Sequence, residues 1–250
     1  WKANGGTRVT FTESGDNPAG GYQANTTAGF SIVDYVGTGA AGTIAHGLGA
    51  VPEVIIVKTR DGVDDYPSYW KNAGTSPEDY AFKFNLTASA TSYDDAGAWN
   101  DTIPTSSVFT VGSANYTNKN DDNLIAYVFT PIQGYSKFGI YTGNGNADGP
   151  FIYTGFKPAW VLIKETTSGN TNDWNIYDSK RSAANPMDDI VEVNLSDAEG
   201  TGRADIDFLS NGFKQRNTHA DSNRDDGTFV YMAFAEQPFV TSGGVPCTAR

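Results

Sequence analysis

The sequence of 250 residues is short of several residue types, and each shortage excludes something. It has a single cysteine, Cys247, so no internal disulfide can hold the fold together. It has only 2 His, which leaves few candidates for histidine-based catalysis. Charged residues reach 18%, the formal net charge is −12, and no run of basic residues occurs. Binding to the phosphate backbone of nucleic acid needs clustered cations, so we expect no nucleic-acid partner.

Long apolar runs are also missing. The longest, such as "VPEVIIV" (51–57) and "LIAYVF" (124–129), have the length of a β-strand, so we expect no membrane insertion. The sequence begins at Trp1 rather than Met, which we interpret as a processed or truncated end.

The residues that are plentiful favour β-structure. Aromatic residues make up 13%, and the 28 Gly and 11 Pro are scattered along the chain. Because charged residues are few, Asn, Thr, Ser and Gly must cover much of the surface, and these favour turns and pleated sheets over helices. We predict an all-β fold, with helical turns only within 76–82 and 186–193.

A long-range echo in the sequence indicates an internal repeat. Residues 30–58 and 138–164 both run from Phe through a Gly-x-Gly turn to an apolar strand that ends in Lys. Pro52 answers Pro158, and Lys58 answers Lys164, at a shift of 106 positions. Trp70 likewise answers Trp174. Further echoes join "VFTVGS" (108–113) to "IDFLSNGF" (206–213), and "DDNLIAYVF" (121–129) to "DDGTFVYMAF" (225–234).

The strands within each copy are short and are bounded by Gly, Asn, Asp or Pro, which is typical of a sandwich. We therefore predict tandem, jelly-roll-like β-sandwich repeats, two copies of about 105 residues by the spacing of the echo. The predicted parts are an extended N-terminal arm or linker at 1–27, repeat 1 at 28–135, repeat 2 at 136–240 and a C-terminal tail at 241–250. Whether the repeats form separate sandwiches or one merged sandwich stays open.

The glycines after the first strand imitate a nucleotide site. Gly37-x-Gly39-x-x-Gly42 matches the dinucleotide fingerprint, which requires a helix to begin at the third glycine. Here "TIAHGLGAVPEV" follows, and its glycines and proline exclude a helix. The second copy has "GNGNADG" at the matching position, which keeps turn residues but not the fingerprint. We interpret both segments as β-hairpin turns.

Two acidic loops resemble calcium loops in part. Residues 144–149 ("NGNADG") place Asn, Asn and Asp at alternate positions with Gly sixth, but the twelfth position is Gly155 instead of a bidentate Glu. Residues 221–227 ("DSNRDDG") have their Gly seventh. We predict hairpin loops and no cofactor, with a structural Ca²⁺ ion as the alternative.

Candidates for catalysis are few. His46 and His219 have no counterparts in the other copy, and neither neighbours a nucleophile motif. We interpret His46 as a strand-end residue that hydrogen-bonds a turn. Asp205 and Asp207 flank one strand residue and are expected on one face, which is compatible with the carboxylate pair of a glycosidase but is not specific.

The paired tryptophans give the candidate ligand site. Trp70 and Trp174 each follow the apolar strand of their copy and have Asn and Asp nearby. One interpretation is a core or rim aromatic kept by duplication. The other is a ring on which a sugar stacks, which makes Trp70 and Trp174 the predicted ligand-binding residues.

Several long segments resemble one known family. They include "NLIAYVF" (123–129), "KFGIYTGNG" (137–145), "TGFKPAWVLIK" (154–164) and "YMAFAEQPFV" (231–240). Together they resemble a domain found in virion proteins of tailed bacteriophages, especially tail-fibre and tail-associated structural proteins of marine and cyanobacterial phages. The resemblance covers nearly the whole chain and implies an exterior position on a virion, other virion proteins as partners and a homo-oligomer, with a trimer favoured. It supplies no catalytic residues.

Three functions follow as hypotheses. The first is a non-enzymatic structural protein of a phage tail fibre or spike that contributes to attachment to a host-surface glycan. The second is a capsid-surface decoration protein or a purely architectural virion protein. The third is a polysaccharide depolymerase that uses Asp205 and Asp207.

Overall fold

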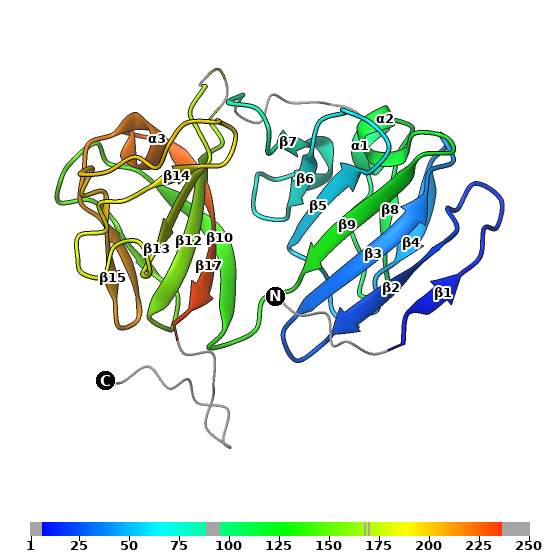
Figure 1. The fold of residues 1–250 in the computed structure, drawn as a ribbon, viewed down its shortest axis with the longest axis horizontal. Helices are drawn as coiled ribbons and strands as arrows, with labels where there is room; N and C mark the ends of the chain where they lie inside the picture. The colour runs from blue at the N-terminus through cyan, green and yellow to red at the C-terminus, as the bar shows by residue number, and fades with distance from the viewer. Residues whose placement is uncertain (1–6, 89–95, 168, 170, 237–250) are drawn as a thin grey trace. The chain divides into compact units, whose positions relative to one another are not determined.

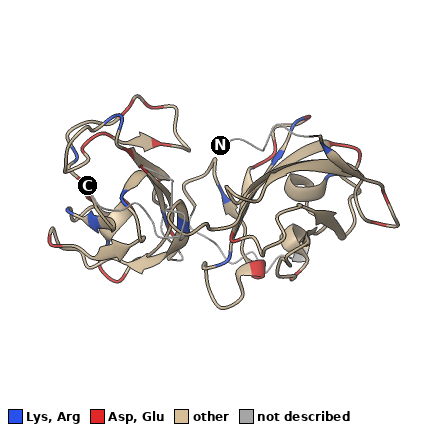
Figure 2. Cartoon of the chain, turned by 90° about the horizontal axis from the view of Figure 1, so that it is seen from below, with Lys and Arg blue, Asp and Glu red and all other residues tan. Residues whose placement is uncertain are grey.

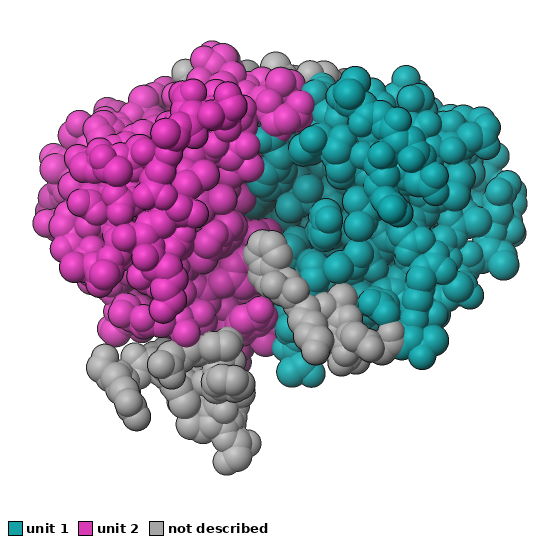
Figure 3. Space-filling model, in the orientation of Figure 1, with its two compact units in different colours: residues 1–84, 90–130 teal, residues 85–89, 131–250 magenta. Residues whose placement is uncertain are grey.

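The computed structural model describes residues 7–88, 96–167, 169 and 171–236, and most of its regular elements are β-strands (Figure 1). The predicted all-β fold class is confirmed. The chain divides into two compact units, unit 1 with residues 1–84 and 90–130, and unit 2 with residues 85–89 and 131–250 (Figure 3).

Unit 1 contains a large and a small antiparallel sheet. The large sheet has the order β1 (Val9–Phe11), β2 (Gly20–Asn25), β3 (Phe30–Val36), β9 (Asn123–Phe129), β5 (Val54–Thr59), β6 (Pro67–Trp70), β7 (Phe82–Lys83). The small sheet pairs β4 (Gly42–Ala45) with β8 (Val108–Val111).

Unit 2 is built in the same way. Its large sheet has the order β10 (Ser136–Thr142), β17 (Thr228–Ala235), β12 (Pro158–Glu165), β13 (Asn175–Asp178), β14 (Val191–Glu192). Its small sheet has the order β11 (Phe151–Tyr153), β16 (Gly212–Gln215), β15 (Ile206–Leu209).

The helices of the described part are single turns. They are η1 (Pro77–Asp79), α1 (Ala96–Trp99), α2 (Asn115–Asn118) and α3 (Ala220–Asn223). The turn predicted within 76–82 is present as η1, whereas residues 186–193 contain β14 and no helix. No helix among the described residues is long and apolar enough to cross a lipid bilayer.

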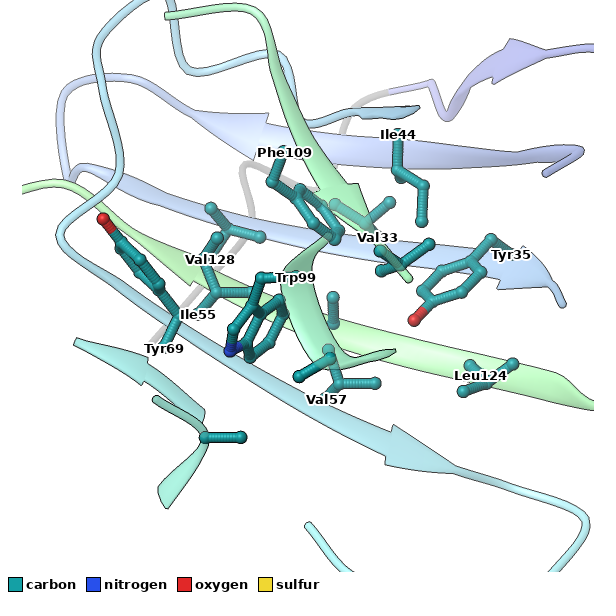
Figure 4. Packing of buried hydrophobic residues seen from close by; sticks show 14 of the residues in the cluster. Val33, Tyr35, Ile44, Ile55, Val57, Tyr69, Trp99, Phe109, Leu124 and Val128 are labelled. Carbon is teal, nitrogen blue, oxygen red and sulfur yellow. The ribbon is translucent and has the colours of Figure 1, made fainter. Parts of the chain in front are cut away.

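Each unit closes around its own aromatic core. In unit 1, Ile44 and Phe109 of the small sheet pack with Val33 and Val57 of the large sheet (Figure 4). Trp99 is buried among them, and its ring meets the Tyr69 ring edge-on at a centroid distance of 6.0 Å. The core of unit 2 joins residues of both its sheets in the same manner. Two sheets that face each other across such a core form a β-sandwich.

The two units share a strand order. Without β1 and β2, the large sheet of unit 1 runs β3–β9–β5–β6–β7, which corresponds to β10–β17–β12–β13–β14 of unit 2. The β4–β8 pair corresponds to β11–β16. The duplication itself stays a prediction. The segment matched to "VFTVGS", residues 206–213, contains β15 and the first two residues of β16, and only its β16 part corresponds to β8.

The register also separates the two tryptophans. Trp70 lies opposite Val54, whereas the residue opposite Trp160, the equivalent of Val54, is Asp178. Trp174 comes just before β13 begins at Asn175. The prediction that Trp70 and Trp174 occupy matching positions is therefore wrong.

The N-terminal segment is not a separate arm in its described part, residues 7–27. Strand β2 pairs with β3 over six residues, from Gly20 opposite Tyr35 to Asn25 opposite Phe30, and β1 pairs with β2. The predicted arm at 1–27 thus contributes two strands to unit 1, which extend the large sheet on the side of β3 away from β9. The predicted tail at 241–250 lies outside the described residues.

The Gly-x-Gly segments are corners between sheets and not hairpins, which corrects the sequence interpretation. Strand β3 lies in the large sheet and β4 in the small one, and the chain crosses between them through 37–41. A Cβ on Gly37 would lie 2.1 Å from the Lys119 carbonyl oxygen, and Gly39 has a φ of +70°. In unit 2, a Cβ on Gly143 would lie 2.3 Å from the Arg224 carbonyl oxygen. Glycine is therefore required at both corners.

A buried asparagine holds each corner. In unit 1, the last residue of α2, Asn118, is fully buried, and its Oδ1 accepts the Thr38 N–H at 2.9 Å. Its Nδ2 donates to the carbonyls of Ala40 and Gly112, and its own carbonyl accepts the Gly39 N–H at 2.8 Å. Nearly all of its hydrogen-bonding capacity is spent on joining α2 to the corner.

Unit 2 repeats this clamp. The Asn223 Oδ1 accepts the Asn144 N–H at 3.0 Å, and its Nδ2 donates to the carbonyls of Asn146 and Asn217 at 2.8 and 2.6 Å. Its carbonyl accepts the Gly145 N–H at 2.9 Å. We call Asn118 and Asn223, with the hydrogen bonds just described, the corner clamps.

We predict that Asn118→Ala or Asn223→Ala lowers the free energy of unfolding by roughly 2–4 kcal/mol, because each leaves several buried backbone groups without a partner. Urea denaturation of the full chain measures the effect. The control is Asn120→Ala, since the exposed Asn120 side chain bonds only to Asp121, and we expect a change below about 0.5 kcal/mol. Equal effects of Asn118→Ala and Asn120→Ala would contradict the clamp.

Candidate functional site

A polar groove of about 340 Å³ lies on unit 1, where β1, β2, β3 and β9 come together. Its polar lining includes Arg8, Thr10, Asp34, Arg60 and Asn123, and Phe11 adds an aromatic ring. Glycine forms part of the floor, because a Cβ on Gly20 would lie 2.1 Å from the Asp34 carbonyl oxygen. Glycine at this position lets the backbones of β2 and β3 approach closely beneath the groove.

One wall of the groove carries an ion pair. The Arg8 guanidinium faces the Asp34 carboxylate with two nitrogens, and Nε donates to Oδ1 at 2.7 Å. Both side chains are partly exposed, so water weakens the pair. The Asp34 carboxylate raises the pKa of Arg8 through the hydrogen bond, and the arginine stays charged.

A second cation stands at the same groove. The Arg60 backbone N–H donates to the Asn123 carbonyl at 2.7 Å, which fixes the position of the residue. Among the residues that the structure describes, no side chain forms a hydrogen bond or ion pair with its guanidinium. Arg60 brings a guanidinium to the groove, and the nearby Asp61 carboxylate, which accepts two hydrogen bonds from Asn123, interacts electrostatically with Arg60. Guanidinium groups bind carboxylates and sulfates through paired N–H donors, so the groove suits an acidic ligand.

Charge elsewhere is dispersed. Figure 2 shows the acidic and basic residues mainly in loops and near strand ends, with the strands largely free of them. Among the described residues, no group of three or more His, Cys, Asp or Glu side chains is arranged to hold a metal ion.

The predicted ligand residues Trp70 and Trp174 are both buried, at 2% and 0% exposure. The Trp70 Nε1–H donates to Ser68 Oγ at 2.9 Å. The ring of Trp174 lies beneath a lysine, with the Lys164 Nζ 5.7 Å from its centroid. Neither ring has a face open to a sugar, so both are packing residues here, which is the other interpretation that the sequence left open.

Lys164, next to Trp174, is a buried cation. Its side chain is fully buried on β12, and Nζ donates to the Thr87 carbonyl at 2.7 Å and to the Asn172 carbonyl. Burial lowers the pKa of Lys164 to about 8, although Asp173 and Glu165 oppose the shift. Through Thr87, the lysine joins residues 85–88 of unit 2 to the large sheet of that unit.

Asp205, one of the two predicted acids, lies at the centre of a buried network in unit 2. Its Oδ2 accepts the Tyr177 hydroxyl at 2.7 Å, and its Oδ1 lies 2.7 Å from His219 Nδ1. The Arg203 Nε lies 3.0 Å from Oδ2, and Arg203 also donates to both oxygens of Asp221. Burial lowers the pKa of Arg203, but Asp221 and Asp205 outweigh it, and the pKa is raised overall. We call these five residues the Arg203 network.

Asp207 does not share this environment. It lies on β15, partly exposed, and its carboxylate pairs with Arg216 Nε at 3.3 Å. The expectation that Asp205 and Asp207 face one site is therefore wrong, because Asp205 precedes the strand and turns into the core. Nothing in this arrangement places a substrate between the two carboxylates.

The histidines are bonded within the fold. His46 follows β4 and is fully buried, and its Nε2 lies 3.2 Å from the Thr105 carbonyl while its Nδ1 accepts the Leu48 N–H at 3.3 Å. Burial lowers the pKa of His46, so the ring is neutral near pH 7. As predicted, it hydrogen-bonds turns at the end of a strand. His219 precedes α3 and belongs to the Arg203 network.

The calcium-like loop at 144–149 is held by its own side chains. The Asn144 Oδ1 accepts the Asn146 N–H at 3.1 Å, and the Asn146 Oδ1 accepts the Asp148 N–H at 2.9 Å. The Asp148 carboxylate pairs with Lys214 at 2.7 Å. The alternate positions of Asn and Asp reflect turn formation at the corner.

A domain family described as a domain of unknown function, DUF7483, matches residues 1–238. The chain belongs to this family. No curated protein and no solved structure matches the chain. Membership in the DUF7483 family therefore brings no assigned ligand or activity, and the site must be argued from its residues.

We predict that Asp205→Ala lowers the free energy of unfolding by about 3–5 kcal/mol, because Tyr177 and Arg203 lose a buried partner. The matched control, Asp207→Ala, removes only a partly exposed ion pair and is expected to cost less than about 1 kcal/mol. Urea denaturation of the full chain compares the two. A cost for Asp207→Ala as large as that for Asp205→Ala would show that the network is not the reason.

We predict that Lys164 makes stability depend on pH between about 8 and 10.5. In that range the unfolded chain keeps the lysine proton and the folded chain releases it, so stability rises with pH. A lowering of this size corresponds to roughly 3 kcal/mol. Comparing the unfolding free energies of the natural chain and Lys164→Met at pH 7.5 and 10 isolates the effect, with exposed Lys71→Met as control. Parallel pH dependences of the natural chain and Lys164→Met would refute it.

Proposed function

We propose that this protein is a non-enzymatic structural protein of a tailed-phage particle, located in the tail fibre or spike, where it contributes to attachment to a glycan on the host surface. The sequence resemblance to virion proteins supports the class. The sandwich architecture supports a structural role, since each unit closes around its own core and presents loops and sheet edges to its surroundings.

The observation that carries the proposal is that the polar residues considered for catalysis are bonded to other parts of the fold. Asp205 is buried in the Arg203 network, His219 joins that network with a side chain that is 44% exposed, His46 is buried between turns, and Asp207 pairs with Arg216. Side chains engaged in this way hold loops together. The depolymerase hypothesis depended on Asp205 and Asp207 acting together, and their separate partners weigh against it.

The groove of unit 1 replaces the two tryptophans as the contact for a glycan. It is polar and open to solvent on one side, and it contains the Arg60 guanidinium beside Asn123 and Thr10. Amide, hydroxyl and guanidinium groups are hydrogen-bonding partners for sugar hydroxyls and carboxylates. A guanidinium forms charge-assisted hydrogen bonds with carboxylates, so Arg60 favours acidic sugars over neutral ones.

The position in the particle can be tested with antibodies raised against the chain. Immunogold labelling of purified particles is expected to mark the tail fibres or spikes. Labelling of the capsid faces would replace the proposal by the decoration hypothesis, and particles without any label would refute a virion role.

Glycan binding is tested separately. We expect the full chain, presented on a multivalent support, to bind host cells or acidic glycans on an array, and Arg60→Ala to reduce that binding at least tenfold. The control is Arg216→Ala, the same substitution in unit 2, which should leave binding unchanged. Binding that Arg60→Ala does not alter would exclude the groove, while absence of binding by the natural chain would leave only the structural part of the proposal.

A further inference from the structure

The corresponding strands β3 and β10 of the two units differ in the number of strands that pair with them. In unit 1, β3 pairs with β9 on one side and with β2 on the other. Its counterpart in unit 2, β10, pairs with β17 on one side and, among the described residues, has no strand on the other (Figure 1). The strand is seven residues long and carries one charge, Lys137, so it is a full-length edge strand with little protection.

The backbone groups that face this edge can be identified from the pairing. Past the end of the strand, the Gly143 N–H donates to the Gly227 carbonyl at 2.8 Å. Antiparallel partners alternate between hydrogen-bonded and non-bonded pairs, so Tyr141 exchanges bonds with β17 whereas Ile140 and Thr142 direct their N–H and C=O groups outward. No backbone or side-chain group in the described part of the chain hydrogen-bonds to these outward groups of Ile140 and Thr142.

Unit 1 shows what covers the equivalent positions. Asp34, three residues before the corner glycine of β3, pairs with Arg8, which lies just before β1. Thr43 on β4 donates its N–H to the Asn17 Oδ1 at 2.8 Å, between β1 and β2. The N-terminal segment thus binds the edges of both sheets of unit 1 through polar contacts.

Unit 2 has apolar residues where unit 1 has these polar ones. Ile140, three residues before the corner glycine of β10, stands in the place of Asp34 and is 50% exposed. Phe151, which precedes the buried Ile152 as Thr43 precedes Ile44, is 45% exposed. The edge of unit 2 therefore lacks the charge that would discourage strand pairing and offers apolar surface in its place.

We propose that β10 is an interface at which two copies of this chain pair edge to edge, with their β10 strands antiparallel about a two-fold axis next to Ile140. The two large sheets of unit 2 then form one continuous sheet across the dimer. This inference does not depend on the proposed role in a virion.

A second copy of the chain is the partner that the strand pairing and the charges favour. The described N-terminal segment already pairs with β3 in unit 1, so it is not available to cover β10 of another copy. Pairing β10 with β10 covers both edges at once, as a self-complementary interface must. Around the two-fold, Ile140 meets Ile140, Phe138 meets Thr142, and Lys137 lies opposite Gly143, so no like charges face each other.

The test is the mass of the full chain in solution by sedimentation equilibrium. We expect a concentration-dependent species at twice 26.7 kDa and a shift of at least tenfold toward the monomer in Ile140→Lys, which places two ammonium groups side by side. Ile103→Lys is the matched control, because Ile103 is also exposed, at 51%, and belongs to unit 1 instead of the β10 strand. Circular dichroism confirms that both variants fold.

Hydrogen exchange and a cross-link distinguish a second copy from other occupants of the β10 edge. In the dimer, the Ile140 and Thr142 amides are protected from hydrogen exchange. Ile140→Cys in a Cys247→Ser background forms a covalent dimer on mild oxidation, because the Cα atoms of opposed hydrogen-bonded residues lie about 5.5 Å apart. Ile103→Cys should not. A monomer with protected amides would mean that another part of the same chain covers β10, and a trimer or a dimer unaffected by Ile140→Lys would equally overturn the proposal.

Discussion

Both units depend on the corner clamp, in which a buried asparagine at the end of a single-turn helix holds the chain where it crosses from one sheet to the other. Asn118 and Asn223 each accept an N–H of the corner through Oδ1 and donate twice through Nδ2. Tyr35 and Tyr141 add a hydroxyl bond to the same helices, at 2.5 and 2.6 Å. A buried polar side chain is favourable only when its bonds are made, so these groups tie the two sheets of each sandwich into a single arrangement.

The clamp also explains why the units can share a framework and differ at their surfaces. Once the corner, the central strands and the core are fixed, the edges and loops are free to vary. Unit 1 has two additional strands, which cover β3 and line the groove beside Arg60. In the described part of unit 2 no strand covers β10, and this unit contains the Arg203 network instead. The features that we connect with function therefore lie outside the shared framework. They are the groove beside Arg60 in unit 1, for which we propose a glycan, and the apolar β10 edge in unit 2, for which we propose a second copy.

Much of the fold could be predicted from the sequence, and the failures have identifiable causes. Few charges, many aromatics and short strands bounded by turn residues lead to an all-β fold. The hairpin interpretation of "VGTGAAG" failed because glycine reports a backbone conformation and not which strands pair. The clamps were missed, although "NKNDD" and "NRDD" recur before β9 and β17 and could have drawn attention to Asn118 and Asn223. Trp70 and Trp174 misled because a tryptophan with polar neighbours in sequence can still be buried in space.

The sequence by itself determined the class of fold, the strands that form the two cores, and the turns at the Gly-x-Gly segments, because these follow from local propensity and periodicity. Only the tertiary structure decided which residues meet. It separated Asp205 from Asp207 by turning one into the core, paired the N-terminal segment with β3, and gave β10 a single neighbouring strand in the part of the chain that is described. Contacts between distant residues depend on strand order and register, and neither can be read from the spacing of residues along the chain.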